Sequence, residues 1–172
     1  QSWRHADWPP GKNSTVRINI EPEGLDFTFA LPEFGVEEEI SEDTSQKVKN
    51  VLDQIDFESF KIQFNGVGTF PKARSPRVIW VGVKVGKEYL ISLAKIVEEK
   101  LKPLGFTSDK TFRPHVTIFR VKNRIDDITD KLKKFNSVDL GMEQVCEIKF
   151  KKSILTQSGP VYSDLHIVRA KK

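Results

Sequence analysis

The chain has 172 residues, of which 38% are hydrophobic and 30% charged, with a formal net charge of +4 and a sequence pI of about 9.1. No apolar run approaches the ~20 residues needed to span a bilayer and the first residues lack a signal-peptide pattern, so we expect a cytoplasmic protein. One cysteine, Cys146, excludes an intramolecular disulfide and a cysteine-built zinc site. The mild positive charge suits an anionic substrate, and it equally suits a lysine-rich solvated surface.

Strands and helices are predicted along the whole chain after residue 15. Stretches rich in β-branched and aromatic residues predict strands near 16–20, 25–30, 61–70, 77–83, 113–121, 146–155 and 162–169. Amphipathic stretches predict helices over about 41–56, 87–102 and 124–135. Ser41 is the expected N-cap of the first helix, and Pro103 and Gly105 stop the second. This mixture predicts an α+β fold.

The order of these elements repeats. From Asp26-Phe27-Thr28, and again from His115-Val116-Thr117, the chain runs strand, helix, strand, turn and strand. Two similar half-units predict a bilobal protein whose sheets face a central cleft, with the lobes related by a pseudo-two-fold axis. Thr28 and Thr117 would then point into that shared cleft.

Residues 1–15 have no counterpart in this repeat, and the chain starts with Gln rather than Met. We expect either that a strand and a helix are missing from the N-terminal side, or that residues 1–15 are a foreign or poorly determined segment. An ordered cap built on Trp3 and Trp8 is another interpretation. Residues 16–172 are expected to form a single bilobal domain.

The clearest functional pattern is a histidine and a threonine two positions apart. Alternation along a strand puts His115 and Thr117 on the same face. An imidazole and a hydroxyl side by side, with Arg113 and Arg120 in the same stretch, suit binding a phosphate and moving a proton beside it. A half-buried structural histidine is the alternative interpretation, because a pattern of three residues is common by chance.

The histidines do not indicate a metal site. His5, His115 and His166 are the three in the chain, and their spacing is not typical of a catalytic metal centre. We therefore expect no catalytic metal. His166 lies on an apolar strand, which favours a structural role, and His5 falls in the unmatched segment and receives no role.

Four motifs together carry a family resemblance over about residues 16–169. They are Arg-Pro-His-Val-Thr-Ile-Phe-Arg-Val-Lys at 113–122, Gly-Val-Gly-Thr-Phe-Pro at 66–71 with Arg-Val-Ile-Trp-Val-Gly-Val at 77–83, Leu-Gly-Phe at 104–106, and Leu-Thr-Gln-Ser-Gly-Pro-Val-Tyr at 155–162. In these motifs the chain resembles the two-histidine phosphoesterase superfamily, and most closely the RNA 2′,3′-cyclic phosphodiesterases, also called 2′-5′ RNA ligases.

The resemblance implies a fold, a reaction and a substrate. The fold is bilobal, with two antiparallel sheets around a central cleft and helices on the outside. The reaction is hydrolysis of a 2′,3′-cyclic phosphate without metal or cofactor, and 2′-5′ ligation is its reverse. The substrate is RNA with a 2′,3′-cyclic phosphate or a 2′-5′ linkage, and we expect a monomer.

The family's first motif is a second H-x-T, and here it falls on Asp26-Phe27-Thr28. Thr28 and Thr117 would then donate hydrogen bonds to phosphate oxygens, and His115 would act as the general base or the general acid. Asp26 occupies the position of the first histidine. Asp26 could serve as a base if its apolar neighbours desolvate it, but it would also repel the phosphate, so we expect reduced activity. A sequence that is unreliable over about its first 40 residues is the alternative explanation.

Further residues are candidates for contacts with RNA. Arg113, Arg120 and Tyr162 are the predicted RNA-binding side chains. Phe70 and Trp80 are interpreted as core residues, although an aromatic ring at a cleft rim could stack on a nucleobase. Two other functions stay open: a weakened relative that binds RNA ends or nucleotides without turnover, and an interaction domain that keeps only the scaffold.

Overall fold

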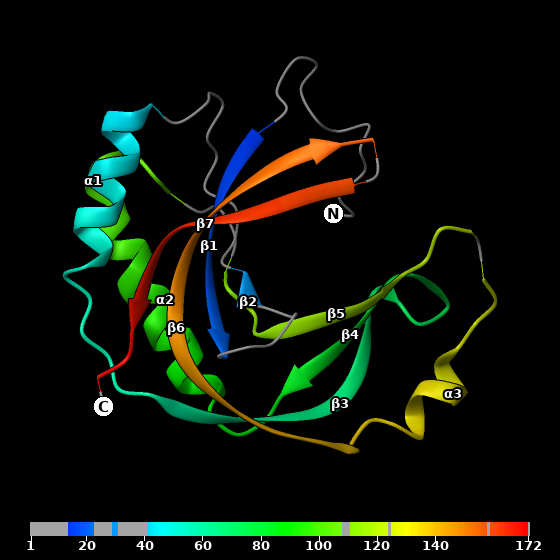
Figure 1. Cartoon of the computed structure of the whole chain (residues 1–172). Coiled ribbons are helices and arrows are strands. Elements are labelled where there is room, and N and C mark those ends of the chain that lie inside the picture. Colours follow the sequence, from blue (N-terminus) through cyan, green and yellow to red (C-terminus); the bar gives the residue numbers. More distant parts are fainter. Residues whose placement is uncertain are drawn as a thin grey trace.

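A computed structural model describes residues 14–22, 29–30, 41–107, 111–123, 125–157 and 159–171. The predictions made for His5, Asp26 and Thr28 lie outside the described residues. Among the described residues, no helix is long and apolar enough to cross a membrane. The elements in chain order (Figure 1) are β1 (Ser14–Pro22), β2 (Phe29–Ala30), α1 (Glu42–Leu52), β3 (Phe60–Lys72), β4 (Ser75–Val83), α2 (Lys87–Leu101), a 3-10 turn (Lys102–Leu104), β5 (His115–Arg120), α3 (Thr129–Lys133), β6 (Asp139–Thr156) and β7 (Gly159–Arg169).

The long strand β6 connects all the others. It pairs antiparallel with β1 and β7 over its second half and with β3 over its first half. Val145 pairs with Pro22 of β1 and with Phe60 of β3, so these two strands lie on opposite edges of β6. β7 also lies opposite β1, and it therefore shares one edge of β6 with β3. The α+β fold with a mostly antiparallel sheet is confirmed.

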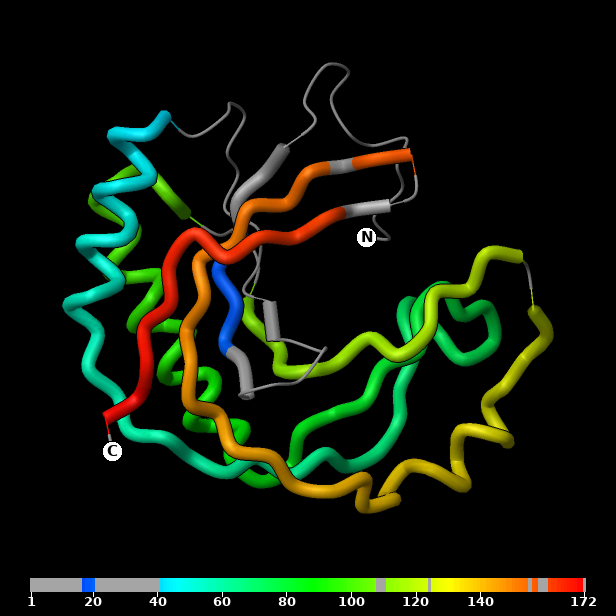
Figure 2. Tube along the Cα trace, in the orientation of Figure 1, coloured from blue at the N-terminus to red at the C-terminus, as the bar shows by residue number. Residues whose placement is uncertain are grey.

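β3 carries the sheet onward to the strand that holds the H-x-T motif. Its first residues pair with β6, its later residues pair with β4, and β4 pairs with β5. Figures 1 and 2 show β3 and β6 as long curved strands, with β4 and β5 at the far end of the curve from β7. The bilobal arrangement with an internal repeat stays a prediction.

Two helices cover one side of the strands. Ser41 is the N-cap of α1, as expected, and its Oγ accepts a hydrogen bond of 3.1 Å from the Thr44 amide. Glu42 and Asp43 in the first turn complement the helix dipole. α1 and α2 lie together beside β6 (Figure 1). Their apolar stripes and the strand residues that face them form one core, whose fully buried side chains are Ile20, Val48, Leu52, Ile62, Leu90, Val97, Leu101, Val145, Ile148 and Phe150.

The third predicted helix is much shorter than expected. The sequence predicted a helix over 124–135, but α3 spans only Thr129–Lys133 and buries none of its residues. Asp127 accepts hydrogen bonds from the Thr129 amide and hydroxyl, at 2.8 and 2.5 Å, and these bonds fix a turn where the helix begins. The Ile128 amide donates a hydrogen bond of 3.1 Å to the carbonyl oxygen of Ala73, so a tertiary contact holds the backbone just before the helix.

The strand predicted at 146–155 starts earlier than expected. β6 begins at Asp139, and its first residues pair with β3 from Phe60 to Asn65, with a register shift between Gln63 and Asn65. The sequence preference for a strand is weak there, since Gly141 interrupts the stretch with a φ of +104° and the neighbouring side chains are mostly exposed. Pairing with β3 therefore decides the conformation of this stretch.

Candidate active site

His115 and Thr117 lie on an edge strand next to β4. His115 pairs with Gly82 and Thr117 pairs with Trp80. Residues paired across antiparallel strands share a face, so these four positions lie together on one side of the sheet. Val116, between them, is buried in the core. The imidazole and the hydroxyl therefore lie on the sheet face opposite the core, and both side chains are half-buried.

The imidazole of His115 is oriented by its own backbone. Its Nδ1 lies 2.6 Å from the carbonyl oxygen of Arg113. Because a carbonyl oxygen only accepts, Nδ1 carries the proton and donates this bond. The other ring nitrogen, Nε2, is then the acceptor of the neutral imidazole and the group that can exchange a proton with a ligand. This geometry leaves Nε2 as the ring nitrogen that is available for proton exchange.

Two aromatic rings flank the imidazole. The ring centroid of Phe70, from β3, lies 5.8 Å from that of His115, and the centroid of Trp80 lies 6.0 Å from it, both in edge-on geometry. Phe70 and Trp80 also contact each other at 5.7 Å. Edge-to-face contacts at these distances are the favoured arrangement of aromatic pairs. The three rings form a cluster, which we call the aromatic triad, on the same face as Thr117.

Glycine makes room for this triad. A Cβ placed on Gly68, the cross-strand partner of Trp80, would lie 2.1 Å from the indole ring. A Cβ on Gly82, the partner of His115, would lie 3.0 Å from the Asn65 carbonyl oxygen and 3.4 Å from the indole. A side chain at residue 68 would displace the indole, whereas one at residue 82 would be tightly packed, which accounts most directly for the second glycine of the motif Gly-Val-Gly.

A β-bulge changes the side of the sheet to which Arg120 belongs. The register of β5 shifts between the pairs Ile79–Phe119 and Trp80–Thr117, so that Ile118 has no partner. Strict alternation would place Arg120 and His115 on different faces of the sheet. After the shift, Arg120 pairs with Val78, which lies on the same face of β4 as Trp80. The bulge therefore brings Arg120 to the face of His115 and Thr117.

These polar groups are available to a ligand. The Thr117 hydroxyl and the guanidinium groups of Arg113 and Arg120 make no hydrogen bond or ion pair within the part of the chain that the structure describes. Both arginines are exposed, and Thr117 is half-buried. One imidazole, one hydroxyl and cationic side chains can together bind a phosphate and transfer a proton beside it.

Tyr162 belongs to a different group of strands. It is exposed on β7, and its hydroxyl accepts a hydrogen bond of 3.2 Å from Nη1 of Arg17 on β1. The Arg17 guanidinium carbon also lies 5.7 Å from the centroid of the Tyr162 ring, in cation–π range. Sequence reasoning selected Tyr162 but missed Arg17, because their proximity depends on both strands pairing with β6.

His166 has a structural partner. Its Nε2 lies 2.6 Å from Oδ1 of Asp53, the residue that ends α1. This contact joins β7 to α1 and lies on a different strand from His115. It agrees with the structural role expected for His166.

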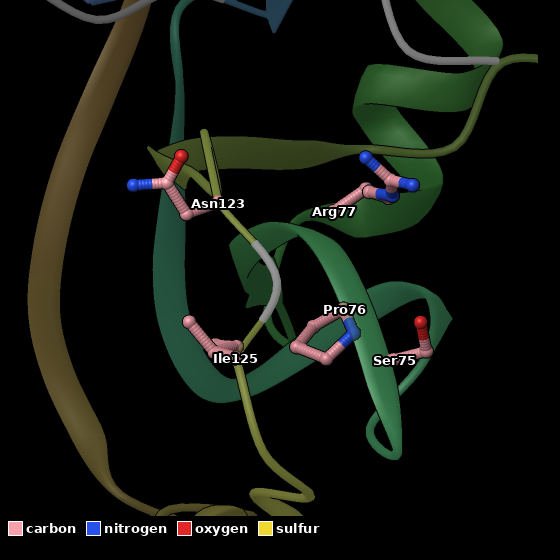
Figure 3. Close-up of a pocket in the computed structure, with 5 residues that line it drawn as sticks. All are labelled: Ser75, Pro76, Arg77, Asn123 and Ile125. Carbon is pink, nitrogen blue, oxygen red and sulfur yellow. The ribbon is translucent and has the colours of Figure 1, made fainter.

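A pocket elsewhere on the strands contains none of the predicted site residues. It has a volume of about 250 Å³ and is lined by Ser75, Pro76, Arg77, Asn123 and Ile125. Figure 3 shows the side chains of Arg77 and Asn123 lying apart on the two sides of this pocket, so its polar groups do not converge. The described residues also include no cluster of three or more His, Cys, Asp or Glu side chains that could hold a metal ion.

Known proteins share this fold and much of this sequence. The structure of LigT from E. coli in apo form superposes with a TM-score of 0.70 at 16% identity, over 94% of this chain and all of that one, which places the fold in the LigT-like α+β class. The family model of the 2′-5′ RNA ligase superfamily matches residues 27–149. The chain belongs to this superfamily of two-histidine phosphoesterases.

Its sequence relatives carry a common name. An RNA 2′,3′-cyclic phosphodiesterase of Archaeoglobus fulgidus is 42% identical over 148 residues, which make up 86% of this chain and 81% of that protein. An RNA 2′,3′-cyclic phosphodiesterase of Aeropyrum pernix is 38% identical over 135 residues, 77% of each chain. The family resemblance recognised in the sequence motifs is confirmed.

Proposed function

We propose that this protein hydrolyses the 2′,3′-cyclic phosphate at the end of an RNA chain or on a nucleotide. The observation that carries the proposal is the His115 imidazole, whose Nδ1 is held by the Arg113 carbonyl so that Nε2 is left for the substrate, with Thr117 beside it. The names of the relatives support the same reaction.

The reaction needs two proton transfers. A water oxygen attacks phosphorus and loses a proton to a general base, while the bond from phosphorus to one ribose oxygen breaks and that oxygen takes a proton from a general acid. His115 can perform either step through Nε2, as base when neutral and as acid when protonated. Thr117 and Arg120 would stabilise the charge that develops on the non-bridging oxygens.

Metal independence and reverse ligation belong to this proposal as well. Imidazole acid–base chemistry needs no Lewis acid, because phosphorus in a five-membered cyclic ester is activated by its ring. For ligation, a 5′-hydroxyl would take the place of water: its oxygen attacks phosphorus and loses its proton to the base, the bond from phosphorus to the ribose 3′-oxygen breaks, and that oxygen takes a proton from the acid, which leaves a 2′-5′ linkage. We propose a monomer acting on RNA ends, with Arg113, Arg120 and Tyr162 contacting the RNA and Thr28 contributing a second hydroxyl to the phosphate.

A second candidate function follows from Asp26. A carboxylate at the position of the first histidine would repel a phosphate, and one positioned acid–base group contributes roughly 10²–10⁴-fold to rate. The chain could therefore bind RNA ends or nucleotides without turning them over.

The deciding experiment is hydrolysis of adenosine 2′,3′-cyclic phosphate in EDTA. We expect turnover by the unaltered chain, loss of at least about 100-fold in His115→Ala, and little change in His166→Gln, the matched control outside the site. Equal loss in both variants, or dependence on added metal, contradicts the proposal. Tight binding without turnover supports the second function.

A further inference from the structure

Phe70 is an aromatic side chain left accessible beside the proposed catalytic imidazole. It is 40% exposed, although its ring contacts both Trp80 and His115. An exposed apolar side chain is common on its own, but one whose ring contacts a histidine that can exchange a proton offers a surface to a ligand bound there. Under the proposed function a phosphate lies at His115, so the occupant of this surface would be a group attached to that phosphate.

Trp80 acts as the support of this ring. Its indole lies over Gly68, and its Nε1 atom is buried and has no hydrogen-bond partner within the described part of the chain. Its polar edge is therefore turned inward. Of the two rings, Phe70 is the one that a ligand can reach, and the contact with Trp80 limits the orientations that the Phe70 ring can adopt.

We propose that Phe70 stacks on the nucleobase of the nucleotide whose cyclic phosphate lies at His115. This inference rests on the proposed function and specifies how its substrate is held. In a nucleoside 2′,3′-cyclic phosphate the ribose joins the phosphate to the base, so a base lies within one sugar ring of the reacting phosphorus. Phe70 is the exposed aromatic neighbour of the imidazole, at a centroid distance of 5.8 Å.

Stacking on the aromatic ring of Phe70 predicts weak discrimination between nucleobases. Every nucleobase has a π-face, and stacking on an aromatic ring is tolerant of sequence. Within the described part of the chain, the ring of Phe70 contacts those of Trp80 and His115. We expect all four nucleoside cyclic phosphates to be accepted, with purines favoured over pyrimidines because of their larger stacking area.

The test compares substrates with and without a base. The probes are adenosine 2′,3′-cyclic phosphate, cytidine 2′,3′-cyclic phosphate and glycerol 1,2-cyclic phosphate, which has the five-membered cyclic ester but no base or ribose ring. The variants are Phe70→Leu, which keeps an apolar side chain without a π-face, and Phe70→Tyr, which keeps the ring. Phe135→Leu changes an exposed phenylalanine near α3 and serves as the matched control.

We expect Phe70→Leu to lower kcat/KM for the two nucleoside substrates about tenfold, as loss of one base-stacking contact does, mainly through KM. Glycerol 1,2-cyclic phosphate should change less than about twofold, Phe70→Tyr should recover most of the loss, and Phe135→Leu should have no effect. Equal loss for all three substrates would assign Phe70 a structural role and overturn the inference, as would no loss for any of them.

A binding measurement separates this inference from the proposed function. If the unaltered chain hydrolyses none of the three probes, the proposed function fails, and calorimetric titration with adenosine 2′-monophosphate still decides the role of Phe70. Binding that weakens about tenfold in Phe70→Leu and recovers in Phe70→Tyr supports the base contact. Binding that is equal in all three proteins, or absent from all three, overturns it.

Discussion

The indole ring of Trp80 occupies the space directly above the α-carbon of Gly68 on the neighbouring strand. A methyl group at residue 68 would meet three indole carbons between 2.1 and 2.6 Å away. We therefore expect Gly68→Ala to displace Trp80 and, with it, the contacts of the aromatic triad. Overpacking of this kind costs about 1–3 kcal/mol, and kcat/KM for adenosine 2′,3′-cyclic phosphate should fall at least tenfold.

The matched control for Gly68→Ala is the double variant with Trp80→Phe, whose smaller ring leaves room for the new methyl group. Thermal unfolding and steady-state kinetics of both single variants and the double variant would form a complete cycle. A double variant that is more damaged than both single variants contradicts the steric explanation.

Arg120 should bind the substrate, because the bulge at Ile118 places it on the face of His115. We expect Arg120→Ala to raise KM for adenosine 2′,3′-cyclic phosphate roughly tenfold, in line with a charge-assisted hydrogen bond. Arg77→Ala is the control, since Arg77 is an exposed arginine that lines the separate pocket and not the site of His115. Equal effects of the two substitutions on KM would contradict this assignment.

Asp26→His should raise activity. A second imidazole would supply the missing proton transfer, and a general acid or base contributes roughly 10²–10⁴-fold. The measurement is kcat at saturating cyclic nucleotide in EDTA, with Asp56→His as the control for an aspartate replaced at an exposed position. A fall in kcat in Asp26→His would instead identify Asp26 as a working base.

Tyr162 and Arg17 should contribute to the binding of RNA chains but not of mononucleotides. We expect Tyr162→Ala to raise KM for an oligoribonucleotide with a terminal 2′,3′-cyclic phosphate about tenfold, as loss of one stacked base does, while KM for adenosine 2′,3′-cyclic phosphate is unchanged. Arg17→Ala should reduce the slope of log affinity against log salt by about one, the value for one phosphate contact. Parallel losses on both substrates would place Tyr162 in the catalytic centre instead.

Asp127 gives the turn before α3 a defined pH dependence. Hydrogen bonds from the Thr129 hydroxyl and amide lower the pKa of the Asp127 carboxyl group, since they favour its charged form. Stability from these bonds is present above the ordinary Asp range and is lost as pH falls through the lowered pKa. The Thr129 amide resonance should therefore titrate with a midpoint below about 3.9, and in Asp127→Asn it should not titrate. A midpoint at or above the ordinary value contradicts this account.

Strand positions were predicted well where the side chains themselves favour extended backbone. The stretches around Val78 to Val83 and His115 to Arg120 are rich in β-branched and aromatic residues, and both form strands. The prediction was wrong for most of residues 124–135, where the Ile128 amide bonds to the Ala73 carbonyl and the helix spans only Thr129–Lys133. It was also wrong for the start of β6, because pairing with β3 is not visible in the local sequence. In both places tertiary contacts override local preference.

In the candidate site, too, local relationships were predicted and those that depend on tertiary contacts were not. Alternation alone brought His115 and Thr117 to one face, since that relationship is local to a single strand. The proximity of Phe70 to His115 depends on the registers of three strands, and the side on which Arg120 lies depends on a bulge. The glycines were a sequence signal for the proximity of Phe70 and His115, because Gly68 pairs with Trp80 and Gly82 pairs with His115.

The two neighbours of Val145 have a consequence for how the molecule unfolds. β6 pairs with two groups of strands: β3, which leads to the strands of the aromatic triad, and β1 and β7, which hold Arg17 and Tyr162. At Val145, β6 has a strand of each group on its two edges. Detaching either group would expose backbone amides of β6 and open the core that side chains of both groups share. The protein should therefore lose both groups of strands in one cooperative step, and damage to the core under either group should lower the melting temperature of the whole.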